Sequence, residues 1–177
     1  GRAEASIGEI RQNVAWGETS EALARRFGNR ATLLDRPILY GDSYVDVVLR
    51  GERIAGYVFN VYFQMDKDRH GLKRIHLERP RHGATLGVYR AVVAELRAEL
   101  GEPQQSCKTP PRASGGYQAA ATRIWKIDQD VVRAGFLDTT LGATEDCPDE
   151  RSPGRCGLTA QLFVQIMPAD AAPATCR

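Results

Sequence analysis

The chain has 177 residues, of which 42% are hydrophobic, 26% charged and 7% aromatic. This composition excludes a collagen-like, low-complexity or mainly disordered protein. The 24 Lys and Arg residues against 22 Asp and Glu give a net charge of +2, too small for a strong electrostatic attraction to nucleic acid or to an anionic membrane. No apolar run approaches the length of a membrane-spanning helix. The length predicts one domain, or two small ones packed together.

The first half of the chain predicts a helix followed by three strands. Residues 1–17 fit either a short helix or a strand. Thr19 or Ser20 can cap a helix over about 20–27, which Gly28 ends. Three stretches that alternate apolar and polar residues predict strands joined by polar turns: 38–49, 57–65 and 72–78.

The second half repeats this order. Thr85 can cap a helix that Gly101 and Pro103 end. Apolar residues at helical spacing form the predicted core-facing stripe of this helix: Tyr89, Val92, Val93, Leu96 and Leu100. Residues 102–118 contain three prolines and two adjacent glycines, and they predict a long surface loop. Three further strands are predicted: 121–127, 131–137 and 158–167.

The order of elements predicts the fold class. Strands that follow one another as a meander favour antiparallel pairing. We therefore expect an α+β protein made of two helix-plus-antiparallel-meander (αβββ) units, packed as one disulfide-stapled domain. Residues 1–103 would hold the first unit and the second helix, and residues 104–177 the long loop and the C-terminal antiparallel strands. The order of elements is the only evidence for a duplication.

All four cysteines lie in the last 71 residues, in polar or Pro/Gly-rich surroundings: Cys107, Cys147, Cys156 and Cys176. Buried free cysteines usually lie among apolar residues, so an even number of loop cysteines indicates disulfides. Zinc sites favour closer pairs than the eight residues that separate Cys147 from Cys156. Three connectivities are open. We expect Cys147–Cys156 to close a local loop and Cys107–Cys176 to hold the C-terminus, with free thiols and a metal site as alternatives.

Disulfides indicate an oxidising compartment. The chain is rich in Ala and Arg and poor in Lys, which suggests a high-GC bacterial source. It begins without Met and shows no targeting segment, so we expect it to be a mature or trimmed chain. The predicted location is therefore periplasmic or secreted.

Two segments carry a resemblance to small bacterial envelope domains. Residues 16–23 read Trp-Gly-Glu-Thr-Ser-Glu-Ala-Leu and precede the meander strands, and residues 89–103 form a helix that ends on Gly-Glu-Pro. With the order of elements, which covers most of the chain, they resemble the beta-lactamase-inhibitor-protein-like fold shared with small outer-membrane lipoprotein assembly factors. No lipobox cysteine lies near the N-terminus, so a lipid anchor is not implied. The resemblance implies binding or inhibition through a sheet face rather than catalysis.

Three histidines recur every six residues: His70, His76 and His82. Histidine is the commonest metal ligand. However, His70 and His82 lie in the turns that flank the predicted strand over 72–78, so the chain would have to fold back to bring the three side chains together. We expect solvated or partly buried histidines and no metal site.

Six residues form the candidate partner-binding set: Tyr40, Tyr44, Tyr62, Arg74, Arg79 and Arg81. The tyrosines can line a sheet face that the helices leave uncovered, and Tyr is enriched at protein interfaces. The arginines belong to a locally basic stretch over residues 73–90 that suits an anionic group or an acidic partner. The alternatives are ordinary sheet packing for the tyrosines and a solvated strand edge for the arginines.

The sequence contains no G-x-S-x-G, P-loop, G-x-G-x-x-G or EF-hand pattern. We therefore expect no catalytic residues and no cofactor. The predicted function is a non-catalytic protein-binding module, of the inhibitor, immunity or envelope-assembly type, whose partner is another envelope or secreted protein. The alternative is a small periplasmic hydrolase or small-ligand carrier that uses a groove between sheet and helix.

Overall fold

The computed structural model describes residues 7–109, 119–138 and 160–171. The helices are α1 (Ile7–Gln12), α2 (Ser20–Phe27) and α3 (Leu86–Leu100), with short 3-10 turns η1 (Gly28–Arg30), η2 (Arg81–Gly83) and η3 (Ala169–Ala171). The strands are β1 (Ala31–Leu39), β2 (Ser43–Ile54), β3 (Tyr57–Asp66), β4 (Leu72–Glu78), β5 (Gln105–Thr109), β6 (Ala119–Ile127), β7 (Asp130–Asp138) and β8 (Ala160–Pro168).

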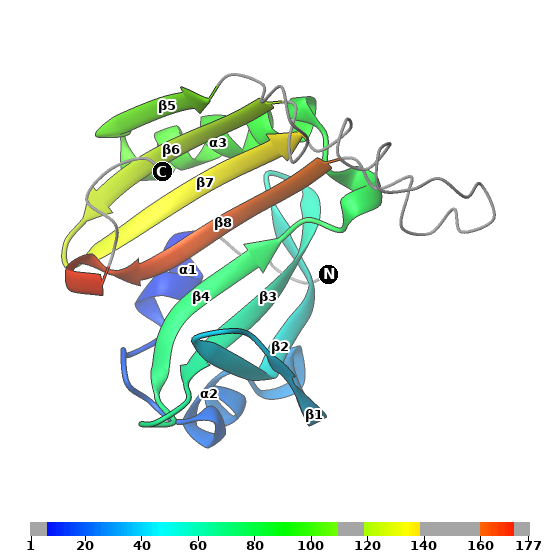
Figure 1. Cartoon of the computed structure of the whole chain (residues 1–177), viewed down its shortest axis with the longest axis vertical. Helices are drawn as coiled ribbons and strands as arrows, with labels where there is room; N and C mark the ends of the chain where they lie inside the picture. Colours follow the sequence, from blue (N-terminus) through cyan, green and yellow to red (C-terminus); the bar gives the residue numbers. More distant parts are fainter. Residues whose placement is uncertain (1–6, 110–118, 139–159, 172–177) are drawn as a thin grey trace.

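The eight described strands form one antiparallel sheet in the order β1-β2-β3-β4-β8-β7-β6-β5 (Figure 1). The α+β class and the antiparallel sheet are thus confirmed. The two halves of the sheet join where β8 lies beside β4, with Ile75 opposite Ile166 and Leu77 opposite Val164. Because β8 returns to the middle of the sheet, the C-terminal strands continue the sheet that the N-terminal strands begin.

Four strands, rather than the expected three, follow α2 and also α3. The prediction missed most of β1 because its central residues 34–37 leave the ladder, so β1 pairs with β2 only at its two ends. It also placed β5 in a long surface loop, because the polar segment Gln105–Thr109 has no apolar alternation. Both missed strands lie at the edges of the sheet, where burial places the weakest constraint on sequence.

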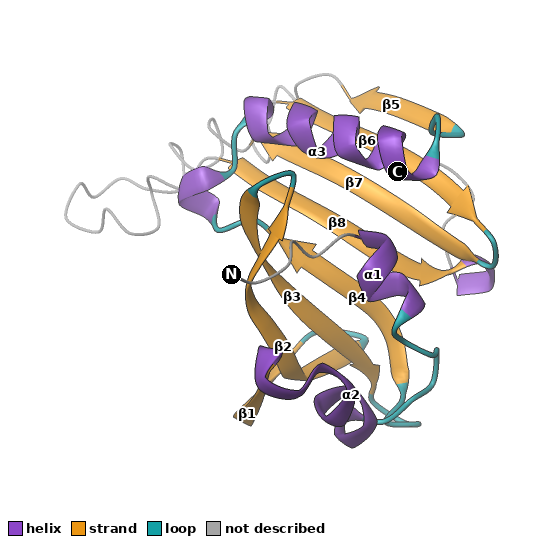
Figure 2. Cartoon of the chain, turned by 180° about the vertical axis from the view of Figure 1, so that it is seen from behind, coloured by secondary structure: helices purple, strands orange, loops and turns teal. Residues whose placement is uncertain are grey.

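All three helices lie on one face of the sheet, which we call the inner face (Figure 2). Leu23 of α2 and Leu96 of α3 are completely buried there. Side chains from the inner face of six strands complete the core: Val47, Leu49, Ile54, Phe59, Val61, Phe63, Met65, Ile75, Leu77, Trp125, Val132, Ala134, Phe136, Leu162, Val164 and Ile166. The opposite face, which no described helix covers, is the outer face.

Local sequence signals define α2 and α3 as predicted. The hydroxyl of Thr19 accepts a hydrogen bond from the Ala22 amide, and Thr85 caps Val88 in the same way, both at 3.2 Å. Gly101 ends α3 with φ 88°, a conformation that other residues avoid. The ambiguous N-terminal stretch contains the short helix α1, whose Ile7 and Ile10 are buried.

Cys107 lies within β5, not in a loop as expected. It is the one cysteine in the described part of the chain, and it is not a free thiol. Cys147, Cys156 and Cys176 lie outside the described residues, so the predicted pairings stay predictions. No helix in the described ranges is long and apolar enough to cross a membrane.

Candidate functional site

Aromatic rings lie side by side across the middle of the outer face. Tyr62 on β3 is directly opposite His76 on β4, and their ring centroids are 6.3 Å apart. The His76 ring stacks on Phe163 of β8, with centroids 5.7 Å apart and an interplanar angle of 26°. The alternation of the strands places all three side chains opposite the core, and each is partly buried. We call Tyr40, Tyr62, His76 and Phe163 the outer-face row.

Tyr40 belongs to this row although it follows the edge strand β1. Its amide donates a hydrogen bond to the Ser43 carbonyl at 2.9 Å, which closes the turn between β1 and β2. Burial raises the pKa of the Tyr40 phenol, and the nearby Tyr62 and Glu78 raise it further. The β1–β2 turn therefore brings a fourth ring to the outer face.

His76 is the polar centre of the row. The Gln165 amide nitrogen lies 3.1 Å from His76 Nδ1, across the β4–β8 pair. Because an amide nitrogen can only donate, Nδ1 accepts and the imidazole is neutral in this arrangement. Burial lowers the pKa of His76, Arg74 lowers it further, and Glu78 opposes both.

Phe163 lies flat against the sheet over Gly135 of β7, its direct cross-strand neighbour. A Cβ atom at position 135 would lie 2.3 Å from Phe163 Cζ and within 2.9 Å of both Cε atoms. The ring therefore occupies the space that any other residue at position 135 would need. The glycine backbone and the His76 ring together hold Phe163 in this orientation.

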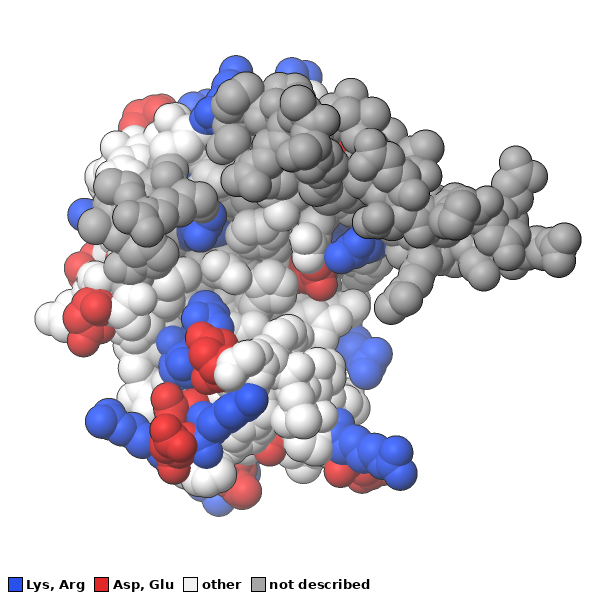
Figure 3. All heavy atoms as spheres, in the orientation of Figure 1, with Lys and Arg blue, Asp and Glu red and all other residues white. Residues whose placement is uncertain are grey.

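The charged side chains beside the row already have partners. Arg74 donates to both carboxylate oxygens of Asp42, at 3.0 and 3.1 Å, and also to the amide oxygen of Gln64. Glu78 accepts a hydrogen bond from the Gln161 amide at 2.7 Å. Figure 3 shows acidic and basic atoms gathered together in the lower part of this face and a mostly uncharged centre. The outer face thus presents rings beside one neutralised ion pair, Asp42–Arg74, and one hydrogen-bonded carboxylate, Glu78.

The structure brings three of the six predicted partner-binding residues together: Tyr40, Tyr62 and Arg74 lie on the outer face. Tyr44 does not join them. It packs at the edge of the inner-face core, and its hydroxyl lies 3.0 Å from Nδ1 of His70. The prediction that the tyrosines share one face therefore fails for Tyr44, because an irregularity in the β2–β3 pairing reverses the facing of β2 after its first residues.

Arg79 and Arg81 lie beyond the end of β4, away from Arg74. Arg79 donates to the carbonyl of Val58 at 2.9 Å and its guanidinium lies over the Tyr57 ring, so it stabilises the strand end. Arg81 is exposed in η2. The basic stretch is therefore divided between two places in the fold.

His70 and His82 are exposed in turns, whereas His76 is partly buried. Among the residues that the structure describes, no group of three or more His, Cys, Asp or Glu side chains could hold a metal ion.

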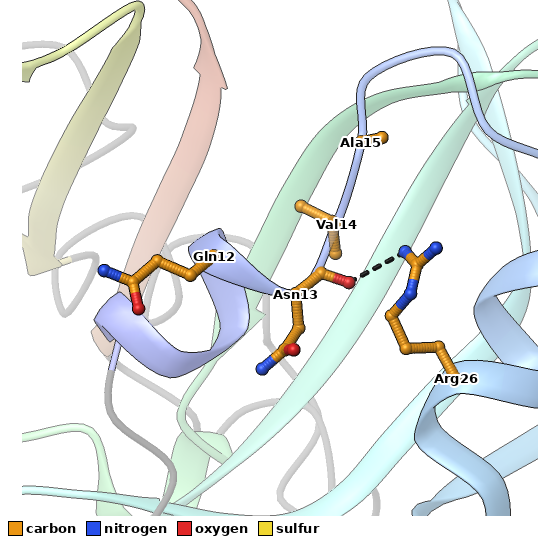
Figure 4. A pocket seen from close by; sticks show the side chains of 5 residues that line it. All are labelled: Gln12, Asn13, Val14, Ala15 and Arg26. Atoms are coloured by element: carbon orange, nitrogen blue, oxygen red, sulfur yellow. Dashed lines mark hydrogen bonds between the residues drawn. The ribbon is translucent and has the colours of Figure 1, made fainter.

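A shallow pocket of about 280 Å³ lies on the helix side, between the segment after α1 and α2 (Figure 4). Its lining residues are Gln12, Asn13, Val14, Ala15 and Arg26. Arg26 donates to the Asn13 carbonyl at 2.8 Å and also pairs with Glu18. None of the lining side chains is a nucleophile or a histidine, so this pocket does not favour the hydrolase alternative.

Comparison with known proteins gives no relative. The chain matches no family model, no curated protein and no solved structure.

Phe163, Gln165 and Gly135 were not among the site residues predicted from the sequence. Alternation in the strand predicted over 158–167 already placed Phe163 and Gln165 on the face opposite its apolar residues. Alternation does not predict the pairing of β8 with β4, which brings these side chains to His76.

Proposed function

We propose that this protein is a non-catalytic binding module whose outer sheet face receives another protein. The observation that carries the proposal is the outer-face row, in which rings from three neighbouring strands and from the β1–β2 turn lie partly exposed on the face opposite the helices. Tyr and other aromatic residues are enriched at protein interfaces because they bury a large area with little loss of conformational freedom.

The solvent-facing side of an antiparallel sheet ordinarily carries polar residues. Here rings occupy the central positions and charged groups surround them. This arrangement matches the anatomy of a protein interface, in which an aromatic centre is enclosed by a polar rim.

We further propose that the module acts in the periplasm or outside the cell, as two helix-plus-meander units stapled by disulfides. The four cysteines support this location. The resemblance to the beta-lactamase-inhibitor-protein-like fold supports an inhibitor, immunity or assembly role through a sheet face. The partner would be an envelope or secreted protein.

The test is capture from an envelope extract of a high-GC bacterium with purified, tagged protein. We expect the wild-type chain to hold one protein in a stable 1:1 complex. Tyr62→Ser should reduce capture at least about tenfold, as loss of an interface anchor does. The matched control is Leu86→Ser, since Leu86 is 44% exposed at the start of α3, on the helix side.

Two outcomes would contradict the proposal. Repeated failure to capture a protein, with a small molecule bound instead, would favour the ligand-carrier alternative. Equal loss of capture in the Tyr62 and Leu86 variants would show that the outer face is not the binding surface.

A further inference from the structure

We infer that Gly135 is a positioning residue of the outer face, and that the flat Phe163–His76 stack it permits receives an uncharged, apolar segment of the partner protein. This inference depends on the proposed function, and it adds the chemistry of the partner and a residue that shapes the site.

Gly135 acts through Phe163. Its backbone φ is not in the left-handed region, so the glycine is not required by the conformation of β7. Its role is spatial, because an added Cβ would approach the ring to 2.3 Å. The three nearest atoms all belong to the far end of the Phe163 side chain, so the ring can move away while the backbone stays in place. A larger residue at 135 would therefore lift the ring from the sheet.

The position of Phe163 determines the shape of the face. With the ring lying over Gly135, its other side faces outwards beside the His76 ring, which it stacks at 26°. Phe163 stays partly exposed although it covers the glycine. The result is a flat aromatic surface, at the line where the two halves of the sheet meet, that an apolar side chain can contact without a large change in either protein.

The charges around this surface indicate what it binds. Asp42 and Arg74 neutralise each other through two hydrogen bonds, and Glu78 accepts from Gln161. A charged partner segment would have to displace these contacts and desolvate its own charge. An uncharged apolar segment buries against the rings at no such cost.

The test compares wild type, Gly135→Ala and the matched control Gly87→Ala in the capture experiment above, at about 50 and 500 mM NaCl. Gly87 lies in α3 with only the Thr85 hydroxyl near its Cβ position, at 3.8 Å, so alanine is accommodated there. We expect the amount of captured partner to fall about tenfold with Gly135→Ala and to stay at the wild-type level with Gly87→Ala. We expect capture by the wild type to change less than about twofold with salt.

Proton NMR of the free chain gives a second readout that needs no partner. The ring-current shift of Phe163 on the His76 ring protons should fall in Gly135→Ala and stay unchanged in Gly87→Ala. Unchanged His76 shifts in Gly135→Ala would overturn the positioning role.

Phe163→Leu keeps the inference testable if Gly135→Ala folds poorly, because it removes the ring without a clash. It should lose capture to the same extent. Full capture by Gly135→Ala and Phe163→Leu, or loss of wild-type capture at high salt, overturns the inference and leaves the proposed function standing. No capture by the wild type overturns the proposed function itself. A complex of twice the chain mass also overturns the inference, because the occupant would then be a second copy of this chain.

Discussion

Gln165 of β8 donates a hydrogen bond from its amide nitrogen to Nδ1 of His76 on β4, at 3.1 Å. The two residues are direct cross-strand neighbours in the pair that joins the halves of the sheet. A protonated imidazole carries a hydrogen at Nδ1 and would face the amide donor, and it would also lie near Arg74. The native arrangement therefore requires the neutral histidine.

This requirement predicts a pH dependence of stability. Burial places the pKa of folded His76 below the ordinary value of 6.5, so below pH 6.5 the unfolded chain binds more protons than the folded one and the free energy of unfolding falls as pH falls. Between pH 7.5 and 5, the wild type should lose more stability in urea unfolding than His76→Gln does. Parallel losses in the two chains would contradict a neutral His76 with a lowered pKa.

Substitution of Arg30 should cause a large loss of stability, because Arg30 neutralises a buried carboxylate. Glu52 is 3% exposed and accepts from Arg30 Nε at 3.0 Å. Hydrogen bonds to Glu9 and Glu52 hold the pKa of Arg30 above its usual value. Arg30→Ala should cost about 2–3 kcal/mol, less than a fully buried pair because Arg30 is 31% exposed. Thermal and urea unfolding measure this cost.

The exposed Arg25 of α2 provides the control for Arg30, and Arg25→Ala should cost less than about 0.5 kcal/mol. Adding Glu52→Gln to Arg30→Ala should restore part of the stability, because the uncompensated charge is then gone. An Arg30→Ala chain as stable as Arg25→Ala would mean that Glu52 does not depend on the pair.

Asp130 connects the N-terminal segment to the hairpin of β6 and β7. Its two carboxylate oxygens accept from Trp16 Nε1 at 2.8 Å and from Arg11 at 3.3 Å. Asp130→Asn should cost about 2 kcal/mol in the free energy of unfolding, since a charged acceptor is lost beside a buried arginine. Asp128→Asn is the matched control, because Asp128 also contacts Arg11 but is 78% exposed. Equal losses in the two variants would contradict this distinction.

The cysteines predict two disulfides. Peptide mapping without reduction, on protein exported to the periplasm, should find Cys147–Cys156, Cys107–Cys176 and no free thiol. Reduction should then lower stability by about 3–4 kcal/mol for each closed loop. Four free thiols would overturn the proposed compartment and leave a cytoplasmic metal or redox role as the better interpretation.

The fold was predictable where burial and capping leave a local signal. Thr19 and Thr85 mark the starts of α2 and α3, and alternation over most of their length marks β3 and β4. The edge strands were not predictable in the same way, because the Pro37 region of β1 and the polar β5 carry no burial pattern. Alternation also cannot show that β8 returns to pair with β4, since this contact joins residues almost ninety positions apart.

The candidate site was predictable only as separate residues. Tyr40, Tyr62 and Arg74 could be selected from residue type, but their convergence depends on the β1–β2 turn and on the β3–β4 register. Residue type alone misplaced Tyr44, because one irregularity in the β2–β3 pairing puts its side chain on the inner face. Phe163 could be assigned to the site only through the long-range pairing of β8 with β4. The role of Gly135 follows only from the position of the Phe163 ring that lies over it.

The central claim is that the outer face, and not the helix side, contacts the partner. A photo-crosslinking benzophenone side chain at Asn60, which faces the outer side directly opposite Glu78 but is not in the row, tests it most directly. The same group at Arg90, exposed on α3, is the positional control. In living cells, position 60 should give one discrete adduct to another envelope or secreted protein, and position 90 none. An adduct from position 90 with none from position 60 would contradict the account.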